Sequence, residues 1–500
     1  MQVETDTRAA AETVQSVSHF IGGDEVRSVG GGTFDVFEPA TGGRIAEVAF
    51  GEAEDIDRAV KVAQAAFDSG VWSKINPGQR ARHLRKFAEV ILEHQDELGA
   101  IESRDTGKPL ASATAEIALG AEVFSFYAGL AELPDGRTYP ADDGYFVYSK
   151  HEPYGVVGSI SPWNYPFLLA SQKTGPALAA GNCVVLKMAE QSPLSTARLA
   201  QLSAEAGLPD GVFNVVHGDG PTTGAALVAH PGVPKLTFTG SSETGKVILR
   251  SAADNIKSVL LELGGKTPNL IFADADMDQA IAGSLFTAFY NSGQICTSGS
   301  RLLVQKSDAD RVVDAFVDRA RGIRVGSPGA SDTQLGPLIS EEQHARVSGY
   351  IEEGQRGGAT LALGGGRSSV AIDGGYFVEP TIFTDVTPDM RIAKEEIFGP
   401  VLSVMTFEDE AEALAIANDV MYGLSATVWT TDLGRAFRMA EGIDAGIIWT
   451  NSPHYLPINV PYEGHKVSGL GEDLGLEAMN TFTQLKTHVV NFDGASLDWA

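Results

Sequence analysis

Two residues of this sequence have the chemistry of a nucleophile and a general base. Cys296 lies in the segment NSGQICTSGSR, where small residues on both sides leave room for a ligand. A thiolate is a strong nucleophile when its surroundings lower its pKa, although a cysteine in a Gly/Ser loop is often inert. Glu262 ends an apolar run in LLELGGK and precedes two glycines. Apolar surroundings raise the pKa of a carboxyl group and suit it to act as a base. A solvated glutamate at a strand end would instead keep its usual pKa and have no catalytic role.

The other cysteine, Cys183, is expected to be structural. It lies in NCVVLK, an apolar run typical of a buried strand, where a free cysteine packs as a small apolar residue. Two cysteines in 500 residues exclude a disulfide framework and a cysteine-rich metal site. We therefore expect no metal and a reducing, cytoplasmic environment.

Polar and glycine-containing segments follow several predicted strands. Residues 161–166, SPWNYP, follow the run VVGSI, and Asn164 could donate an amide N–H to an oxyanion. Lys187 and Glu190 follow NCVVLK and could hydrogen-bond the hydroxyls of a ribose. Residues 238–241, FTGS, join a strand to a helix N-terminus, which favours phosphate. Each pattern alone is weak, because none of the glycine turns has the usual dinucleotide-binding spacing.

The elements that must position these segments alternate short β-branched runs with longer helical stretches. Buried parallel strands are predicted at residues 156–160, 182–187, 211–216 and 234–238. Helices are predicted between them at residues 166–180, 193–206, 222–229 and 242–253. This rhythm predicts a doubly wound α/β domain, in which ligands bind at the carboxyl ends of the strands. We expect residues 54–131 to be mostly helical and to pack on the outer face of this domain.

A second α/β series is predicted over residues 265–465. Its candidate strands are residues 269–272, 302–305, 401–405, 425–429 and 446–449. Two further segments, 145–152 and 481–491, alternate like half-exposed strands. Because exposed edge strands seek partners, we expect these two to form a small unit used for oligomerisation.

The charge of the chain excludes whole classes of partner. With 37 Lys and Arg against 65 Asp and Glu, the net charge is −28, which repels phosphate backbones and anionic membrane surfaces. We therefore expect neither nucleic-acid nor membrane binding, and no apolar run is long enough for a transmembrane helix. Residues 1–17 are polar and lack the pattern of a secretory signal, so we interpret them as a frayed leader.

Six segments together resemble the aldehyde dehydrogenase superfamily in their order and spacing. They are PWNYP, K-x-x-E, FTGS, ELGGK, GQ-x-C and, at residues 395–400, EEIFGP. The resemblance runs from about residue 30 to 490 and implies an NAD domain, a catalytic domain and an oligomerisation hairpin. We assign these to residues 1–131 with 153–264, to 265–465, and to 132–152 with 479–493. The assembly expected from the hairpin is a homodimer or a homotetramer.

The resemblance implies roles for individual residues. Cys296 would attack the aldehyde, Asn164 and the backbone N–H of Cys296 would form the oxyanion hole, and Glu262 would activate water. The positions that match the dinucleotide site are Ser161, Pro162, Trp163, Lys187, Glu190, Gly220, Gly240, Ser241, Glu395 and Phe398. The cofactor expected is NAD, because a 2′-phosphate would meet the like charge of Glu190. Glu262 also favours hydrolysis over acyl transfer to coenzyme A, since acyl-transferring members tend to lack this base.

The family geometry further implies an aldehyde funnel. Its positions are Tyr165, Leu168, Gln172, Tyr290, Ile295, Thr297, Tyr455, Leu456 and Tyr462. The set is aromatic with scattered polar groups and contains no Arg or Lys, so a medium-sized aromatic or aliphatic aldehyde fits it best. A betaine-aldehyde or amino-aldehyde substrate is the alternative, although Gln172 and Tyr462 occupy positions that are Trp in typical betaine-aldehyde enzymes.

Two departures from the family pattern stand out. Ile295 and Thr297 flank the nucleophile where many relatives carry a second cysteine. Residues 471–475, GEDLG, stand where many members have an Arg–Glu pair, which puts a contact between subunits in doubt. Asp473 could still serve a secondary role in proton relay.

Two other classes of function agree less well with the sequence. A thiol-dependent acyltransferase or esterase without redox chemistry would leave Lys187, Glu190 and the glycine turns idle. A non-catalytic structural protein built on an enzyme fold would be expected to have lost Cys296 or Glu262, and the sequence retains both.

Overall fold

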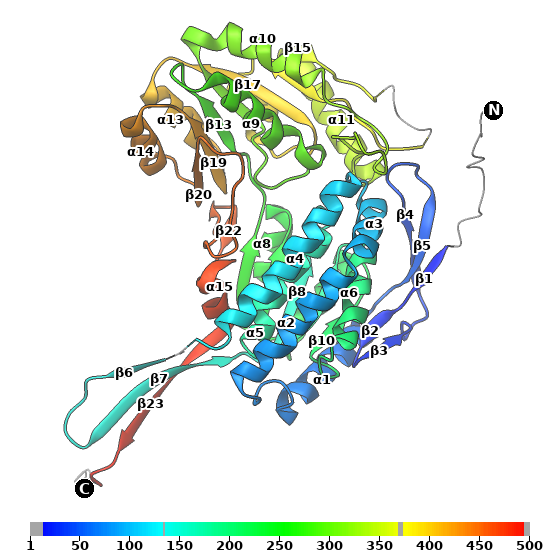
Figure 1. The fold of residues 1–500 in the computed structure, drawn as a ribbon, viewed down its shortest axis with the longest axis vertical. Coiled ribbons are helices and arrows are strands. Elements are labelled where there is room, and N and C mark those ends of the chain that lie inside the picture. Colours follow the sequence, from blue (N-terminus) through cyan, green and yellow to red (C-terminus); the bar gives the residue numbers. More distant parts are fainter. Residues whose placement is uncertain (1–13, 134–135, 369–373, 495–500) are drawn as a thin grey trace.

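Two large sheets, each flanked by helices, make up most of the molecule (Figure 1). The computed structural model describes residues 14–133, 136–368 and 374–494. In Figure 1 the first sheet and its helices form the lower part, and the second sheet forms the upper part. A slender three-stranded sheet projects from the lower part (Figure 1).

The first sheet has eight strands with a parallel centre. Their order is β22 (Gly469–Leu470), β12 (Ser258–Glu262), β11 (Lys235–Thr239), β8 (Val156–Ser161), β9 (Cys183–Met188), β10 (Phe213–Val215), β2 (His19–Ile21) and β3 (Asp24–Val26). The five strands from β12 to β10 are parallel, as the continuous apolar runs predict. From β8 the chain first winds outward through β9 and β10 and then returns to add β11 and β12 on the other side. The strand order switches between β8 and β11, and ligands bind at the carboxyl ends of the strands at such a switch.

Helices connect these strands nearly as predicted. They are α5 (Pro166–Ala179), α6 (Leu194–Glu205) and α8 (Ser242–Ala253), which begin and end within a residue of the predicted helices. The helix predicted at 222–229 is wrong in its first turn, because Gly220–Gly224 is a π-helix and the α-helix α7 covers only Ala225–Ala229. Two glycines and a proline in GPTTG explain why the regular α-helix starts late.

The region predicted to be mostly helical, residues 54–131, is confirmed and contains four helices. They are α1 (Ala53–Ser69), α2 (Pro77–Glu93), α3 (Gln95–Thr106) and α4 (Leu110–Leu130). In α2, Asn76 caps the first turn and Pro77 occupies the first helical position, where its missing N–H costs nothing. Leu84, Phe87 and Ile91 recur at helical spacing and are fully buried, and the rings of Phe87 and Phe124 lie 4.7 Å apart. The helices thus share one core with the first sheet.

The second sheet has seven strands. Their order is β15 (Thr360–Leu363), β16 (Thr381–Thr384), β17 (Val401–Phe407), β14 (Arg301–Gln305), β13 (Pro268–Ile271), β19 (Ser425–Trp429) and β20 (Ile447–Thr450). Its helices are α9 (Met277–Phe289), α10 (Ala309–Ala320), α11 (Glu341–Arg356), α12 (Arg391–Lys394), α13 (Glu410–Asn418) and α14 (Leu433–Gly442). All five predicted strands are present, whereas β15 and β16 were missed because each is only four residues long. Of the two, β15 is the edge strand and is partly exposed.

The amino-terminal segment corrects one prediction. Gln15–Val17, interpreted as part of a frayed leader, forms β1 and pairs in parallel with β5 (Arg44–Ala49), which also pairs with β4 (Thr33–Phe37). The buried side chain of Val17 joins a small apolar cluster with Val36. Residues 1–13 of the predicted leader lie outside the described residues.

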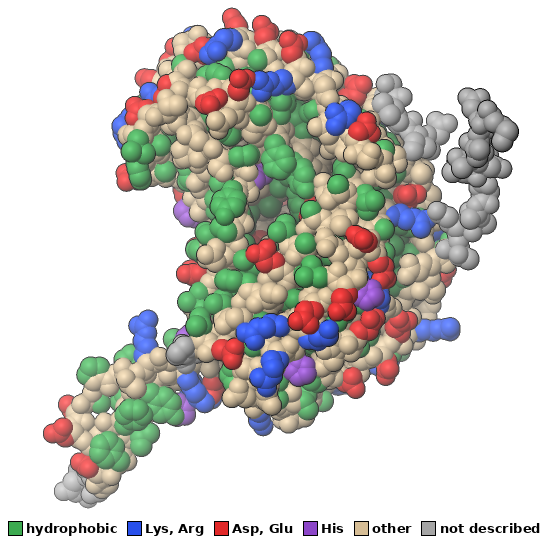
Figure 2. Space-filling model, in the orientation of Figure 1, with side chains coloured by type: hydrophobic (Ala, Val, Ile, Leu, Met, Phe, Trp, Pro, Cys, Tyr) green, Lys and Arg blue, Asp and Glu red, His purple; other side chains and the backbone are tan. Residues whose placement is uncertain are grey.

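The two alternating segments pair with each other. Strands β6 (Gly136–Tyr139), β7 (Tyr145–Pro153) and β23 (Thr483–Asn491) form an antiparallel sheet with Tyr145 opposite Asn491. The predicted second strand was placed two residues too early, because α15 (Gly475–Thr481) continues through Thr481. Apolar side chains gather on this projecting sheet (Figure 2), and Phe146, Leu485 and Val489 are exposed.

The remaining pieces are short. Strands β18 (Tyr422–Gly423) and β21 (His465–Lys466) form a separate two-stranded antiparallel sheet. Across the residues that the structure describes, no helix combines the length and apolar character needed to cross a membrane.

Candidate active site

The nucleophile candidate sits on a sharp turn between the two large sheets. After α9 the chain passes through Asn291 and Ser292, both with left-handed backbone, and Gly293 with φ 70°. A Cβ on Gly293 would lie 2.2 Å from the carbonyl oxygen of Gly399, so only glycine fits there. This turn leaves the thiol of Cys296 half-buried, with the hydroxyl of Tyr462 3.6 Å from Sγ.

Burial dominates the electrostatics of the thiol. It raises the pKa of Cys296 to about 11, and the carboxyl groups of Glu396 and Glu262 add to the rise. The hydroxyl of Tyr462 and the backbone N–H of Thr297 act in the opposite direction, because both hydrogen-bond to the sulfur. The protein alone therefore holds Cys296 as a thiol at neutral pH.

Glu262 lies at the carboxyl end of β12, where the sequence placed it. Its side chain is 5% exposed, and neither carboxyl oxygen has a hydrogen-bond partner within the described part of the chain. Burial raises its pKa well above the usual range, and Asp473 raises it further while Lys173 opposes the rise. An unpartnered carboxyl group with a raised pKa can take a proton from water.

The two glycines after Glu262 bind the base strand to the nucleophile loop. A Cβ on Gly265 would lie 2.3 Å from the carbonyl oxygen of Cys296, so the two backbones are in direct contact. The N–H of Gly265 donates to Glu396 at 3.0 Å, and a Cβ on Gly264 would lie 2.5 Å from the same carboxylate. The ELGG segment thereby fixes the nucleophile loop relative to β12.

Asn164 lies beside the same loop. Its Nδ2 donates to the carbonyl of Gln294 at 2.9 Å, which uses one of its two N–H bonds. The backbone carbonyl of Asn164 accepts from Nζ of Lys108 at 3.0 Å and from Nδ2 of Asn291 at 3.1 Å. These contacts hold the amide group next to the nucleophile loop, with a second N–H left to donate to an oxyanion.

The adenosine end of the predicted cofactor site lies at the carboxyl ends of β9 and β11. Nζ of Lys187 is buried and lies 3.2 Å from Oε2 of Glu190, whose side chain is 37% exposed. Burial lowers the pKa of Lys187, although the Glu190 carboxylate opposes that shift. Ser241 caps the first turn of α8 by accepting from the N–H of Thr244.

Glycine leaves the backbone bare where a dinucleotide would pass. A Cβ on Gly240 would lie 2.4 Å from the ring of Phe238, so no side chain fits. Gly220 has open space around its missing Cβ. Next to them, the hydroxyl of Ser161 is buried at the end of β8 without a hydrogen-bond partner among the described residues, and Pro162 follows half-buried. The bare backbone at Gly220 and Gly240 and the unpartnered hydroxyl of Ser161, as far as the described residues go, are compatible with the predicted dinucleotide site.

The predicted nicotinamide end of the cofactor site contains Glu395 and Phe398. The carboxylate of Glu395 accepts from Arg391 at 2.8 Å and from the hydroxyl of Tyr350 at 2.7 Å, and these bonds lower its pKa. Phe398 has left-handed backbone, with φ 63°, and its ring meets Trp163 edge-on at 5.2 Å. Trp163 follows a strand of the first sheet and Phe398 precedes a strand of the second, so this ring contact joins two predicted cofactor residues from the two parts of the molecule.

The predicted funnel residues fall into groups. Tyr165, Leu168 and Gln172 share the start of α5, where all three are half-buried. Ile295 and Thr297 flank the nucleophile and are buried. The remaining positions are Tyr290, whose hydroxyl lies 3.5 Å from Glu116, and Tyr455, Leu456 and Tyr462 on the segment after β20. Tyr462 reaches the sulfur, whereas Tyr455 is 73% exposed and can only reach an outer rim.

Sequence reasoning missed a buried ion-pair network beneath Tyr165. Nζ of Lys108 contacts Glu116, lies 3.5 Å from Glu102, and lies 4.5 Å from the centre of the Tyr165 ring. Burial raises the pKa of Glu116 to about 7, although Lys108 opposes the rise. The sequence did contain a signal for this network, because Glu116 is a carboxylate within the mostly apolar sequence of α4.

A second missed group lies behind Glu262. The fully buried Lys173 on α5 lies 3.5 Å from the carboxylate of Asp473 and donates to Thr237 at 3.1 Å. Asp473, kept in the sequence analysis only as a relay candidate, is thus part of the surroundings that set the pKa of Glu262.

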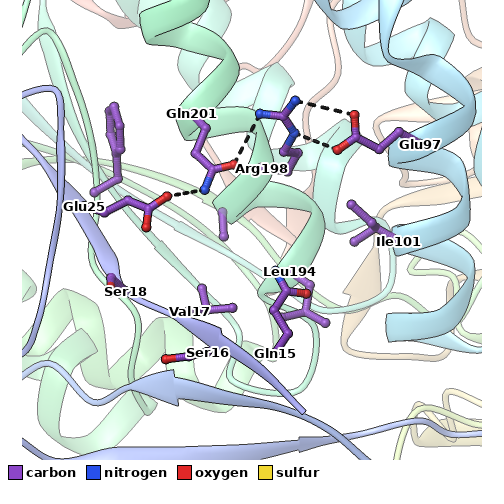
Figure 3. A pocket seen from close by; sticks show the side chains of 12 residues that line it. Gln15, Ser16, Val17, Ser18, Glu25, Glu97, Ile101, Leu194, Arg198 and Gln201 are labelled. Atoms are coloured by element: carbon purple, nitrogen blue, oxygen red, sulfur yellow. Dashed lines mark hydrogen bonds and ion pairs between the residues drawn. The ribbon is translucent and has the colours of Figure 1, made fainter. Parts of the chain in front are cut away.

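A cavity of about 330 Å³ lies away from these groups, between β1, α3 and α6 (Figure 3). Its charged groups already satisfy one another: Arg198 donates to Glu97 at 2.8 Å and to Glu205 at 2.7 Å. Gln201 beside it contacts Glu25 (Figure 3). None of the predicted site residues lines this cavity.

The chain is similar to known proteins over nearly its whole length. The sequence model of the aldehyde dehydrogenase family matches residues 26–488. "Aldehyde dehydrogenase family 2 member B4, mitochondrial" of Arabidopsis thaliana is 45% identical over 97% of this chain and 91% of its own. "Putative aldehyde dehydrogenase DhaS" of Bacillus subtilis is 44% identical over 95% of each chain.

Solved structures have the same fold. An NAD⁺ complex of aldehyde dehydrogenase from Bacillus cereus superimposes with a TM-score of 0.93 at 44% identity, covering 95% of this chain and 97% of the other. Betaine aldehyde dehydrogenase from Staphylococcus aureus, also in complex with NAD⁺, superimposes with a TM-score of 0.95 at 38% identity, covering 97% of both chains.

Proposed function

The chain belongs to the aldehyde dehydrogenase family, and from that premise we propose that it oxidises an aldehyde to a carboxylic acid through a covalent intermediate on Cys296. Oxidation of an aldehyde with NAD is the family activity, and the chain is an NAD-dependent aldehyde dehydrogenase. The observation that supports the covalent mechanism is the contact of Gly265 with the carbonyl of Cys296, which holds the strand that carries Glu262 against the nucleophile loop. The bond from Asn164 to the carbonyl of Gln294 holds the amide against the same loop.

The residues present fit NAD. Glu190 and Lys187 would bind the adenosine ribose, and the bare backbone at Gly240 and Gly220 leaves room for the pyrophosphate. Glu395 would bind the second ribose, for which its bonds to Arg391 would have to be shared or exchanged. When bound, NAD supplies the acceptor for the hydride that leaves the substrate.

The protein's own groups account for the remaining steps. The thiol of Cys296 first loses its proton to water, and the thiolate attacks the carbonyl carbon. The C–O π electrons move to oxygen, where the amide N–H of Asn164 and the backbone N–H of Cys296 stabilise the charge. Loss of hydride leaves a thioester on Sγ. Glu262 then takes a proton from water as its oxygen attacks the thioester carbon, and the C–S electron pair returns to the sulfur as acid leaves. The sum converts aldehyde, NAD⁺ and water into acid, NADH and a proton.

The substrate we propose is an uncharged, medium-sized aromatic or aliphatic aldehyde. Gln172 and Tyr462 occupy positions that are Trp in typical betaine-aldehyde enzymes, so the funnel lacks the walls that best hold a trimethylammonium group. Tyrosines at 165, 290 and 462 provide apolar ring faces with polar ends. A betaine-aldehyde or amino-aldehyde substrate is the alternative, and the absence of these Trp side chains disfavours it.

A comparison of kcat/KM tests this choice. NADH absorbance would be followed with hexanal, phenylacetaldehyde, betaine aldehyde and 4-aminobutyraldehyde. We expect the two uncharged aldehydes to give the larger values. A preference for the cationic pair would overturn the substrate proposal, and oxidation of none of the four would contradict the dehydrogenase assignment itself.

We also propose that the three units expected from the sequence act as cofactor, catalytic and assembly units. The β6–β7–β23 sheet would join copies of the chain, because Phe146, Leu485 and Val489 leave apolar surface exposed on it. Light scattering on the wild type and on a Leu485→Glu, Val489→Glu double variant tests this. A smaller particle is expected for the variant, and an unchanged mass would contradict the proposal.

A further inference from the structure

Among the residues that the structure describes, the charged groups that act on the thiol of Cys296 are acidic, and none of them is a cation that would stabilise its thiolate. The charged side chains acting on the sulfur are Glu262 from β12 and Glu396 from the loop after α12, and both disfavour a negative charge there. A cysteine nucleophile is ordinarily activated by a neighbouring cation, a helix N-terminus or a base. The tyrosines facing the sulfur are Tyr165 and Tyr462, and of these Tyr462 hydrogen-bonds to it.

We propose that Tyr462 is a catalytic residue, whose hydroxyl donates a hydrogen bond to Sγ of Cys296 and stabilises the thiolate before attack and after acyl release. This deepens the proposed function and rests on it for the chemical steps. The two atoms lie 3.6 Å apart although the residues are 166 positions apart in sequence. A hydroxyl at this distance from sulfur is within hydrogen-bonding range.

The hydroxyl is held in place and kept as a donor. The backbone N–H of Tyr462 donates to the carbonyl of Asp473 at 2.7 Å, and the N–H of Asp473 donates back to Tyr462 at 2.7 Å. The carboxylate of Asp473 is itself tied to the buried Lys173. Burial and the nearby acidic groups raise the pKa of Tyr462 well above its usual range, so its proton stays on the oxygen and can only be shared with the sulfur.

The electron balance of the reaction places the hydrogen bond at two moments. Before attack, the negative charge is on Sγ and Tyr462 stabilises it. When the C–S bond forms, the sulfur becomes neutral and the hydrogen bond weakens. When water cleaves the thioester, the C–S electron pair returns to Sγ, and Tyr462 stabilises the leaving thiolate while retaining its own proton. Tyr462 therefore assists both the formation of the nucleophile and its release.

The size of the effect follows from two opposing terms. Losing a hydrogen bond to a charged group should raise the pKa of Cys296 by about one unit. At pH 7.5, below both pKa values, that leaves about tenfold less thiolate, while the more basic thiolate gains about threefold in nucleophilicity, since the Brønsted coefficient is about 0.4–0.5. Removal of the hydroxyl should thus slow reactions of Cys296 about threefold.

Alkylation of the thiol tests this without any aldehyde. The rate of iodoacetamide incorporation at Cys296 would be measured by peptide mass spectrometry at pH 7.5, with and without NAD. The series comprises the wild type, Tyr462→Phe and the protein with 3-fluorotyrosine in place of Tyr462, whose hydroxyl is a stronger donor of nearly the same shape. Tyr376→Phe is the control, because it removes a hydroxyl from a half-buried tyrosine outside the site.

The expected order is Tyr462→Phe slowest by about threefold, the wild type and Tyr376→Phe equal, and 3-fluorotyrosine fastest. Alkylation rates that do not follow the hydrogen-bond donor strength of residue 462 would overturn the proposal. One such result is equally slow alkylation of Tyr462→Phe and of the 3-fluorotyrosine protein, because a purely structural role depends on side-chain shape and not on donor strength. The proposed function is tested separately by the aldehyde panel, so the two failures are distinguishable. Unchanged thermal unfolding of Tyr462→Phe would establish that the isosteric ring preserves the fold.

Discussion

The backbone of Gly265 lies directly against the carbonyl oxygen of Cys296, with only 2.3 Å between that oxygen and the position of a Cβ. This contact joins the end of β12, which carries Glu262, to the loop that carries the nucleophile. It explains why glycine is required in the ELGG segment, since any side chain would push the nucleophile loop away from the base.

Gly265→Ala should therefore damage catalysis more than folding. A displacement of about 1 Å at reacting atoms costs on the order of 100-fold in rate, so kcat/KM should fall by about that factor. Gly349→Ala is the matched control, because a Cβ on this α11 glycine has no heavy atom within 4 Å. Full activity in Gly265→Ala would show that the close contact does not position the nucleophile.

The two cysteines should respond to substitution in opposite ways. Cys296→Ala should abolish dehydrogenase and esterase activity while NAD still binds, since the cofactor groups lie on other elements. Cys183 is fully buried in β9, so Cys183→Ala should lower the unfolding free energy by about 1 kcal/mol and keep kcat. Steady-state kinetics, NAD titration and thermal unfolding measure these outcomes, and more than trace turnover in Cys296→Ala would refute the nucleophile assignment.

Glu262 should be needed after hydride transfer. Glu262→Gln is expected to give a burst of up to one NADH per active site in stopped-flow absorbance, followed by slow turnover, because water lacks its base. In the wild type, turnover should fall as the pH drops through the raised pKa of this carboxyl group. The absence of a burst in Glu262→Gln would point to a role in activating the thiol.

The same raised pKa has a consequence for stability. Between the pKa of an unfolded glutamate, about 4.3, and the higher pKa of folded Glu262, the folded protein binds the additional proton. Stability contributed by this group therefore falls as the pH rises through that window. Glu262→Gln should gain in Tm relative to the wild type at pH 8 and show little difference near pH 4. An equal difference at both pH values would contradict the raised pKa.

Glu190 should select NAD over NADP. A 2′-phosphate at roughly 4 Å from this carboxylate would cost on the order of 1–4 kcal/mol, or about 10- to 1000-fold in affinity. Lys187, 3.2 Å from Glu190, would soften the preference by pairing with the phosphate. The ratio of kcat/KM for the two cofactors in the wild type and in Glu190→Gln measures this. A wild-type ratio of kcat/KM with NAD to kcat/KM with NADP near unity would contradict the proposed role of Glu190.

The sequence predicted the parts of this protein whose signals are local. Continuous apolar runs predicted β8, β9 and β11, and the polar segments after them placed the candidate residues at one edge of the sheet. The strands β4, β5, β15 and β16 carry alternating or weak patterns and depend on pairing with distant segments, so no local signal defined them.

Contacts between distant segments were beyond local patterns as well. Tyr462 was predicted only as a funnel residue, and its hydrogen bond to Cys296 depends on how the chain returns from the second sheet to the first. The pairing of Lys173 with Asp473 has the same origin, because it joins α5 to the segment before α15. The role of Asp473, which lies in the segment that departs from the family pattern, could therefore be inferred only from the structure.

The central claim is that an acyl group becomes covalently attached to Cys296. Glu262→Gln, mixed with NAD and a good aldehyde and quenched in acid, should accumulate the thioester, since the step that removes it lacks its base. Peptide mass spectrometry should then find the mass of the acyl group on the peptide containing Cys296 and not on the one containing Cys183. A burst of NADH without any acyl group on Cys296 would contradict the account.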